Sequence, residues 1–472
     1  MANNGKSKTP EYFRDKLTTV KDDGSRAWIY AKKVKGRYFN RRKIVAVFLL
    51  ALFYIGPFIK IGNEPIMLFD IMQRKFVLFG VVFWPQDFHL ILISFITIIV
   101  FVVLFTVIFG RLFCGWICPQ TIFMEFVFRQ VEYLIEGTAA NQRKLDKQPM
   151  NFEKAWKKSL KHLIFFIISI ITAATFLAYM VGKDEVLRFL SENPFANVSG
   201  WSGLLIFSGL FYFVFAFFRE QVCTIACPYG RLQGVLVDSK SIIVGYDYKR
   251  GEPRGPITKN GISTDNGDCI NCNACVVVCP TGIDIRNGTQ LECINCTACI
   301  DACDAVMDRI DKPKGLIRYD SEDGIETGNH SIINIRSIAY SIVLTLLLVF
   351  VGYLFMLRGD FESTILRARG SLYQVYGADS LSNIYNYNLV NKSNSSIKID
   401  YILESPTGRI KHIQENLAVE IGEIGRGTFL IVINKDELSA SNIPVIIGLY
   451  KDGEKLSTYS STFVGPSSLN KK

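Results

Sequence analysis

The most constraining feature of this 472-residue chain is a cluster of eight of its twelve cysteines within one short stretch. They form two runs, and both runs read C-x2-C-x2-C-x3-C, the bacterial ferredoxin spacing for two cubane iron–sulfur clusters. Clusters of this kind move single electrons, so the runs indicate an electron-transfer protein. The runs consist of Cys269, Cys272, Cys275 and Cys279, and of Cys293, Cys296, Cys299 and Cys303.

The spacing also predicts how the cysteines divide between the clusters. One tight loop can hold three corners of a cube, and in two-cluster ferredoxins the fourth cysteine of each run serves the other cluster. A zinc site would use a single set of four ligands, and a disulfide framework is typical of small secreted domains. The predicted ligand sets are Cys269, Cys272, Cys275 and Cys303 for cluster 1, and Cys293, Cys296, Cys299 and Cys279 for cluster 2. The second run ends in Cys303-Asp304, whereas the first ends in Cys279-Pro280.

The hydrophobic residues, which make up 49% of the chain, are concentrated in long runs. Five of these runs are long enough to cross about 30 Å of hydrocarbon. A shorter run at 76–84 is expected at the membrane interface or against the helix bundle. The polar and basic N-terminus shows no cleavable signal peptide. The five expected spans are residues 44–61, 88–109, 160–181, 201–218 and 337–357.

Lysine and arginine alternate between the loops in a way that predicts the orientation of the spans. Residues 1–43 carry thirteen basic and four acidic residues, whereas the basic residues of 62–87 are only Arg74 and Lys75. The N-terminus and residues 219–336 are therefore expected in the cytoplasm, and the chain after the fifth span outside. The net charge of +10 belongs to the cytoplasmic flanks, where it favours contact with membrane lipid, so no binding of nucleic acid is expected.

The other four cysteines form two matched C-x3-C-P motifs, each at the cytoplasmic end of an expected span. Positions i and i+4 share a helix face, and the prolines predict that a new helix begins directly after Cys118 and Cys227. The dipole of such a helix is expected to lower the thiol pKa. The repetition suggests a duplicated two-helix unit. The four motif cysteines are Cys114, Cys118, Cys223 and Cys227.

Four thiolates at one membrane face would suit Cu(I), zinc or another cluster. The alternative is that these cysteines are small buried hydrophobic residues, which are common in helices. Two matched pairs favour metal or redox chemistry over that alternative. Arg111, Arg219 and Arg231 are expected to add positive charge nearby. No nucleotide or flavin motif is visible, so the electrons are expected from a partner protein or a quinol.

Residues 360–472 lack cysteine and alternate short strand-like segments with turn signals. This pattern predicts an immunoglobulin-like β-sandwich. A binding or assembly role follows only from analogy with other domains of this fold. The expected strands are Asn383–Val390, Ile397–Leu403, Ile410–Ile413, Thr428–Asn434, Val445–Lys451 and Ser457–Val464.

The combination resembles the cytochrome c oxidase accessory proteins of the FixG, CcoG or RdxA type. The segments REQVCTIACPYGRLQ and CPTGIDIRNGTQLECINCTACIDACD carry the resemblance, together with the spans and the β tail. The membrane half also resembles NapH, a membrane ferredoxin of nitrate-reductase electron chains. The resemblance implies assembly of cbb3-type oxidases through a cupric reductase activity, with copper as substrate or transient ligand near the four motif cysteines. It also implies oxidase subunits, copper transporters or copper chaperones as partners.

The expected protein is thus an α-helical membrane bundle with an inserted ferredoxin domain and a C-terminal β domain, in the inner membrane of a bacterium. A quinol-linked conduit without copper chemistry and a non-enzymatic assembly scaffold are alternatives. The sequence leaves open the electron donor, the cluster potentials, and whether the chain forms a homo-oligomer. The expected parts are a basic cytoplasmic tail (1–43), a four-helix membrane domain (44–218), a cytoplasmic region (219–336) with the ferredoxin domain at about 260–312, a fifth span (337–357) and a periplasmic domain (360–472).

Overall fold

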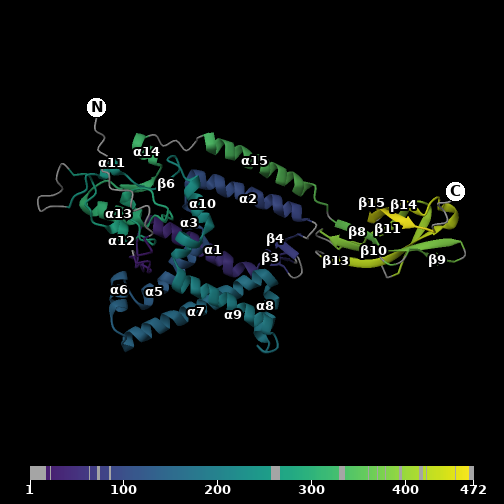
Figure 1. The fold of residues 1–472 in the computed structure, drawn as a ribbon, viewed down its shortest axis with the longest axis horizontal. Helices are drawn as coiled ribbons and strands as arrows, with labels where there is room; N and C mark the ends of the chain where they lie inside the picture. The colour runs from purple at the N-terminus through teal and green to yellow at the C-terminus, as the bar shows by residue number, and fades with distance from the viewer. Residues whose placement is uncertain are drawn as a thin grey trace. The chain divides into compact units, whose positions relative to one another are not determined.

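A computed structural model of the chain forms two compact units, Met1–Gly352 and Tyr353–Lys472 (Figure 1). It describes residues 18–466 except 22, 63, 72–74, 84–86, 257–265, 329–334, 360, 369, 371, 378, 393–395, 414–417, 421–422 and 452. Several expectations therefore fall in part outside the described residues. These are the start of the basic tail, the start of the ferredoxin region, Arg74, the end of the 76–84 run and the last residues of the β domain.

Four helices in the described part of the chain are long and apolar enough to cross a membrane. Each contains or matches one of the expected spans, and two of them, α7 and α9, lie side by side (Figure 1). Their central residues carry almost no charge, which is what a hydrocarbon environment requires. The four are α2 (Phe88–Phe109), α7 (Phe152–Val181), α9 (Val198–Phe213) with its π-helical continuation η5 (Val214–Phe218), and α15 (Ile335–Met356).

The first expected span corresponds to α1 (Arg37–Ile55) and the short 3-10 turn η2 (Gly56–Phe58). The first turns of α1 are basic, so its apolar part is shorter than that of the other four helices. The start of α1 nevertheless contacts the ferredoxin region, where the Tyr38 N–H donates to Asp301. Its end lies beside the end of α7, where the Tyr179 hydroxyl donates to the Phe53 carbonyl at 3.0 Å. α1 therefore runs through the same layer as α7.

The described part of the 76–84 run forms two strands of a sheet that contacts the helix bundle through its first strand. Strands β3 (Met67–Asp70), β4 (Lys75–Leu78) and β5 (Val81–Phe83) form an antiparallel sheet, and β3 contacts α7. The alternation of buried and exposed side chains in β4 is typical of a strand with one face against the protein, because Val77 is buried between the more exposed Phe76 and Leu78. A smaller hairpin precedes the sheet and consists of β1 (Lys60–Ile61) and β2 (Glu64–Pro65).

Short helices connect the spans. Those after α2 are α3 (Leu112–Trp116), α4 (Pro119–Ile122), the π-helix η4 (Phe123–Phe128), α5 (Arg129–Ile135) and α6 (Ala139–Lys147). Helix α8 (Lys183–Ser191) links α7 to α9, and η6 (Val222–Ala226) and α10 (Pro228–Leu236) follow η5.

The ferredoxin region is built around a two-stranded antiparallel ribbon and two short helices that follow the cysteine loops. Val244 on one strand pairs with Tyr319 on the other, and Ile300, Met307 and Ile317 form the buried core beneath them. The elements are β6 (Ile243–Tyr246), α11 (Tyr248–Gly251), α12 (Ala274–Val277), η7 (Ile285–Asn287), α13 (Ala298–Met307), η8 (Asp308–Ile310), β7 (Ile317–Asp320) and α14 (Glu322–Thr327).

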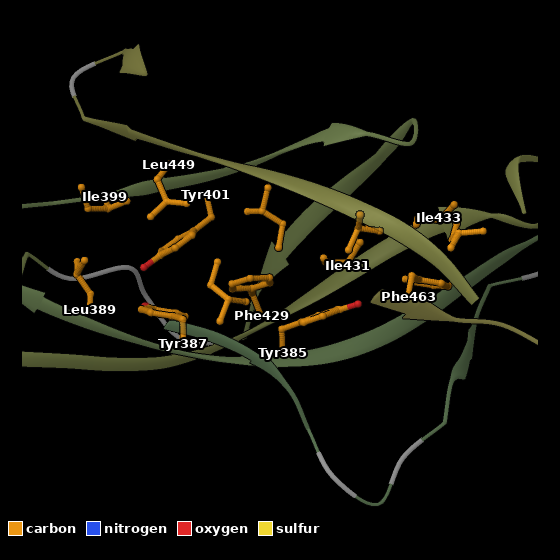
Figure 2. Packing of buried hydrophobic residues seen from close by; sticks show 14 of the residues in the cluster. Tyr385, Tyr387, Leu389, Ile399, Tyr401, Phe429, Ile431, Ile433, Leu449 and Phe463 are labelled. Carbon is orange, nitrogen blue, oxygen red and sulfur yellow. The ribbon is translucent and has the colours of Figure 1, made fainter. Parts of the chain in front are cut away.

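The C-terminal unit is the expected sandwich of two antiparallel sheets. One sheet has the order β12-β13-β10-β8, with β9 also paired to β10, and the other has the order β11-β14-β15. Tyr385, Tyr387, Tyr401 and Phe429 gather between the sheets and form much of its core (Figure 2). The strands are β8 (Phe361–Arg367), β9 (Gln374–Tyr376), β10 (Ser380–Asn391), β11 (Asp400–Ser405), β12 (Gly408–His412), β13 (Ile424–Asn434), β14 (Asn442–Lys451) and β15 (Glu454–Val464), with the 3-10 turn η9 (Lys435–Glu437) after β13.

Candidate functional site

The two cysteine runs fold into loops of the same shape. Asn271 and Asn273 in the first loop, and Asn295 and Thr297 in the second, all have φ between 52° and 63°. Such alternation turns successive backbone N–H groups toward one side and makes a concavity for an anion, as at many iron–sulfur sites. Asparagine tolerates positive φ, whereas the β-branched Thr297 is strained there and must be held by its surroundings.

Two cavities separate the eight ferredoxin cysteines into two groups. One cavity is lined by Cys269, Cys272, Cys275 and Cys303, together with apolar side chains such as Met307. The other is lined by Cys279, Cys293, Cys296 and Cys299, and also by Cys275, which borders both cavities. The grouping is the one that the two predicted ligand sets require, and four thiols around an apolar space are the donor set of a cubane.

The described residues contain no group of three or more histidine, cysteine, aspartate or glutamate side chains close enough to hold one metal ion. This spacing disfavours a zinc site, in which four ligands meet at a single ion. A cubane is wider than an ion, so its thiolates stand further apart. All the cysteines that would hold the two cubanes are buried or half-buried except Cys272, and burial raises the pKa of Cys293 to about 12. Such thiols become ligands only when a bound cation replaces their protons.

The two C-x3-C-P motifs share one backbone conformation. Helix α2 ends at Gly110 with φ 53° and ψ −126°, and η5 ends at Arg219 with φ 50° and ψ −123°. Each motif ends at a helix that begins with proline. Cys118 is the N-cap residue of α4, and Cys227 is the N-cap residue of α10. These matching angles support a duplicated unit, and they place a helix directly after the second cysteine of each motif.

The structure brings the four motif cysteines together. Cys118 and Cys227 both influence the charge state of Cys114 and of Cys223, so all four thiols are electrostatic neighbours. Each is partly buried, and the Cys114 thiol donates a hydrogen bond to the Gln233 Oε1 atom at 3.3 Å. Burial raises the pKa of Cys114 to about 11 and that of Cys223 to about 12.

The expectation that a helix start lowers the thiol pKa is wrong for Cys118. Burial raises the pKa of this thiol, and the backbone N–H groups of Thr121 and Gln120 oppose the rise without outweighing it. Helix α4 continues without a break through η4 into α5, but the stabilisation that its N-terminus gives a thiolate is smaller than the cost of burying the charge. A thiol at this position is therefore protonated until a bound cation replaces its proton.

The first motif packs directly on the loop of the second cysteine run. An added Cβ atom at Gly115 would lie 2.5 Å from the Ile294 carbonyl oxygen, so only glycine fits between the two backbones. The Trp116 indole N–H donates to the Tyr319 hydroxyl at 2.9 Å, and that hydroxyl donates to the Asn295 carbonyl at 3.1 Å.

The second motif is joined to the same loop by Arg111. This buried guanidinium donates one hydrogen bond to the Gly230 carbonyl in α10 and another to the Leu291 carbonyl, which lies two residues before Cys293. The first motif therefore contacts the loop of predicted cluster 2 directly, and the second motif is linked to that loop through Arg111. The membrane-face thiols and that loop form one continuous site.

Sequence reasoning missed a buried ionic group beside the thiols. Arg219, which is 1% exposed, donates to both carboxylate oxygens of Glu132 at 2.5 and 3.0 Å. Lys161 of α7 lies 2.9 Å from Glu136, and Glu220 lies 3.4 Å from Arg219. The charge of Arg219 is thus largely compensated and adds little to the thiol site, contrary to expectation. Glu132 and Lys161 are charged residues in or beside apolar helical sequence, and this position in the sequence could have indicated that they are buried and paired.

A separate apolar cavity of about 590 Å³ opens between the spans next to the first motif. Its walls come from α1, α7 and α9, and from the residues on either side of Cys118. Gln120 provides an amide at its edge, where the side chain donates to the Arg219 carbonyl at 3.1 Å.

Three family models match the chain. A 4Fe-4S dicluster domain matches residues 218–322, which include both ferredoxin runs and the second C-x3-C-P motif. A 4Fe-4S binding domain matches residues 91–137, which include the first motif. An IG-like fold at the C-terminal of FixG matches residues 351–466.

Curated relatives cover most of the chain. Protein RdxA of Cereibacter sphaeroides is 31% identical over 417 residues, or 85% of this chain and 88% of RdxA. Protein RdxB of the same organism is 32% identical over 382 residues, or 77% of this chain and 79% of RdxB. Nitrogen fixation protein FixG of Rhizobium meliloti is 35% identical over 298 residues, which are 62% of this chain and 56% of FixG.

Among solved structures, a crystal structure of a FixG-related protein from Vibrio parahaemolyticus matches 23% of this chain and 97% of its own length, with 16% identity and a TM-score of 0.20. The family assignment depends on the full-length relatives, because the chain spans most of RdxA and RdxB at more than 30% identity. From the cysteine loops, the apolar helices, the C-terminal sandwich and these relatives, we conclude that the chain belongs to the RdxA, RdxB and FixG family of iron–sulfur electron-transfer proteins.

Proposed function

We propose that this protein reduces Cu(II) to Cu(I) at its four membrane-face thiols and thereby prepares copper for the assembly of a cbb3-type cytochrome c oxidase. The observation that carries the proposal is the direct packing of the first C-x3-C-P motif on the loop of predicted cluster 2, together with the link of the second motif to the same loop through Arg111. Cys269, Cys272, Cys275 and Cys303 would hold cluster 1, and Cys293, Cys296, Cys299 and Cys279 would hold cluster 2. The copper transporter or chaperone that exchanges copper with the thiols would be a partner.

The chemistry of the thiols suits this reaction. Each cubane supplies one electron at a time when it is bound, and one electron converts one Cu(II) ion to Cu(I). Thiolates prefer Cu(I), whereas Cu(II) prefers nitrogen and oxygen ligands, so binding at Cys114, Cys118, Cys223 and Cys227 raises the potential of copper.

The test uses the anaerobically purified full-length protein, reduced with dithionite and freed of the excess. Addition of Cu(II) with a coloured Cu(I) chelator should give Cu(I) in the wild type. Cys118→Ser and Cys227→Ser should lose this activity and retain about eight iron atoms per chain, the content of two cubanes. The retained iron is the control for folding.

A variant with all four motif cysteines changed to serine separates the possibilities. Undiminished copper reduction in this variant would place the copper site elsewhere. About twelve iron atoms per chain in the wild type and about eight in the variant would show that the motif thiols hold a third cubane. That outcome would replace copper by a cluster as the resident of the site.

The proposal also includes an orientation. The N-terminus and the ferredoxin region would face the cytoplasm, and the immunoglobulin-like domain the periplasm, as the distribution of basic residues favours. Protease added to spheroplasts should remove the C-terminal domain and leave the ferredoxin region intact. Protection of the C-terminal domain in intact spheroplasts would contradict this orientation.

A second candidate function is oxidation of a membrane quinol, with electrons passed to a redox partner and no copper chemistry. The apolar cavity beside the first motif favours it, because a ring and an apolar tail would fit walls made by the spans, with Gln120 at the edge. Quinol oxidation by membranes containing the protein, unaffected by copper chelators and lost in Gln120→Leu, would favour this function over cupric reduction.

A further inference from the structure

Arg42 joins the first thiol motif to the loop of predicted cluster 2. Its Nε atom donates to the Gly115 carbonyl at 3.0 Å, and its Nη1 atom donates to the Cys296 carbonyl at 2.8 Å. Gly115 follows Cys114 directly in the sequence, and Cys296 is a predicted ligand of cluster 2. One guanidinium group on α1 therefore binds the backbone of the first thiol motif and the backbone of the cluster 2 loop.

The positive charge of Arg42 is buried and lacks an acidic partner. The residue is 4% exposed, and no carboxylate of the described residues forms an ion pair with it. Its Nη2 atom has no hydrogen-bond partner among the described residues. The Phe126 ring lies 5.4 Å from the guanidinium carbon. A buried cation without a counter-charge is strongly destabilising, so its presence requires an anion in the neighbouring site.

A cubane held by four thiolates is such an anion, and its negative charge grows by one when it is reduced. Arg42 lies beside this site, because its guanidinium donates to the backbone carbonyl of Cys296 at 2.8 Å. A fixed positive charge in a poorly solvated position stabilises the more negative state. The reduction potential of the neighbouring cluster therefore rises.

The other cysteine group has an arginine whose charge is compensated. Arg286 lines the cavity of predicted cluster 1, but its guanidinium lies 2.6 Å from the Asp284 carboxylate. The arginine near cluster 1 is thus neutralised, while the arginine near cluster 2 is not. This asymmetry favours electron flow from the cluster 1 site to the cluster 2 site, and onward to the thiols that Arg42 contacts.

We infer that Arg42 is a positioning residue that raises the reduction potential of cluster 2 and keeps its loop in contact with the membrane-face thiols. The positioning part rests on the proposed electron transfer to those thiols, whereas the effect on potential does not require copper. Neither part assigns a catalytic role to the side chain.

The first experiment is an anaerobic redox titration of the full-length protein followed by EPR. Arg42→Gln removes the charge and should lower one of the two midpoints by about 59 mV, which is a tenfold change for a one-electron couple. Arg42→Lys keeps the charge and should leave that midpoint near the wild-type value. Arg41→Gln is the matched control, because Arg41 is exposed on the same helix, and it should move neither midpoint.

Asp284→Asn identifies the two midpoints. It removes the carboxylate that pairs with Arg286, so it should raise the midpoint that Arg42→Gln leaves unchanged. A shift of both midpoints by equal amounts in Arg42→Gln, or of neither, would overturn the effect on potential. These titrations contain no copper, so their outcome is independent of the proposed cupric reduction.

The second experiment tests the contact. Reduced protein is mixed rapidly with Cu(II), and the visible absorbance of the iron–sulfur centres reports their oxidation. Arg42→Lys has a single amine that cannot hold both carbonyls, so the oxidation should slow by about tenfold or more while the midpoint stays. A wild-type rate in Arg42→Lys would overturn the positioning role. The comparison of Arg42→Lys with the wild type tests this role even if Arg42→Gln loses its iron. Failure of the wild type to react with Cu(II) would refute the proposed function and leave the titration result standing.

Discussion

Gly115 and Asn295 approach each other backbone to backbone, so that a Cβ atom on Gly115 would lie 2.8 Å from the Asn295 carbonyl oxygen. Gly115 lies between the two cysteines of a membrane-face motif, and Asn295 lies between two cysteines of the ferredoxin. The two sites are therefore fixed to each other by main chain, and no flexible side chain separates them.

Gly115→Ala should separate these two backbones. We expect a loss of about 1–3 kcal/mol in the free energy of unfolding, because backbone atoms must move to admit the methyl group. Electron passage to Cu(II) should slow, while about eight iron atoms per chain remain bound. Thermal unfolding in detergent and rapid mixing with Cu(II) measure the two effects. Gly203→Ala is the control, since nothing lies within 4 Å of its added Cβ atom, and it should change neither.

Glu132→Gln should strongly destabilise the membrane part. It replaces the carboxylate that accepts two hydrogen bonds from Arg219 by a neutral amide and leaves only the longer contact with Glu220 at 3.4 Å, and breaking a buried ion pair costs about 3–5 kcal/mol. Glu153→Gln is the matched control, because Glu153 is 60% exposed in its pair with Lys157, and its effect should be small. Chemical unfolding in detergent compares the two variants, and equal stabilities would contradict the structural importance of the buried pair.

The same carboxylate predicts a pH dependence. Burial alone would raise the pKa of Glu132, but Arg219 and Lys161 outweigh it and hold the pKa below its ordinary value of 4.5. The unfolded chain therefore binds this proton more readily than the folded one. The stabilisation is present above the ordinary pKa and is lost as the pH falls through the lower folded value.

Unfolding midpoints of the wild type and of Glu132→Gln should therefore converge as the pH falls below about 4.5, the ordinary pKa of the carboxyl. Acid also promotes the loss of bound iron, but this effect is the same in both proteins and cancels in the difference between their unfolding midpoints. A difference between the midpoints that stays constant across this range would contradict the assignment.

Asp301→Ala should loosen the attachment of α1 to the ferredoxin region. The Asp301 carboxylate accepts hydrogen bonds from the Tyr38 and Phe39 backbone N–H groups at 3.1 and 2.7 Å. A side chain of α13 thus caps the N-terminus of α1. We expect a loss of about 1–3 kcal/mol. Asp308→Ala, at a side chain that is 55% exposed, should have little effect in the same thermal unfolding measurement.

Phe429→Ala should destabilise the C-terminal unit alone. Phe429 is fully buried between the two sheets (Figure 2), and removal of a buried phenylalanine costs about 3–5 kcal/mol. Limited proteolysis should then cleave this unit faster, while the iron content and EPR signals remain unchanged. Val375→Ala, at a side chain that is 66% exposed, should resist cleavage as the wild type does. Loss of iron in Phe429→Ala would contradict the independence of the two units.

Local sequence signals predicted much of this structure. The prolines after Cys118 and Cys227 predicted helix starts, and the apolar runs predicted the spans, because both depend on neighbouring residues only. All six expected strands appear with shifted ends. Strand β8 was missed because FESTILR mixes polar and charged residues with apolar ones, and β9 because three residues carry too little pattern.

The long-range features could not be predicted from local pattern. The contact of Gly115 with Asn295 joins residues far apart in the chain, and so do the hydrogen bonds of the buried Arg42 to the Gly115 and Cys296 carbonyls. The wrong expectation for the Cys118 pKa has the same origin. A helix start is visible in the sequence, whereas the burial that outweighs it is a property of the folded protein.

The accessibility of Cys272 has a consequence for the oxidative loss of iron from this protein in air. It is the one exposed cysteine of the twelve, and it lines the cavity of predicted cluster 1. We therefore expect oxygen and chelators to reach a cluster bound there first at this corner. We expect the centre beside Arg42, whose predicted cysteine ligands are buried or half-buried, to lose its iron later.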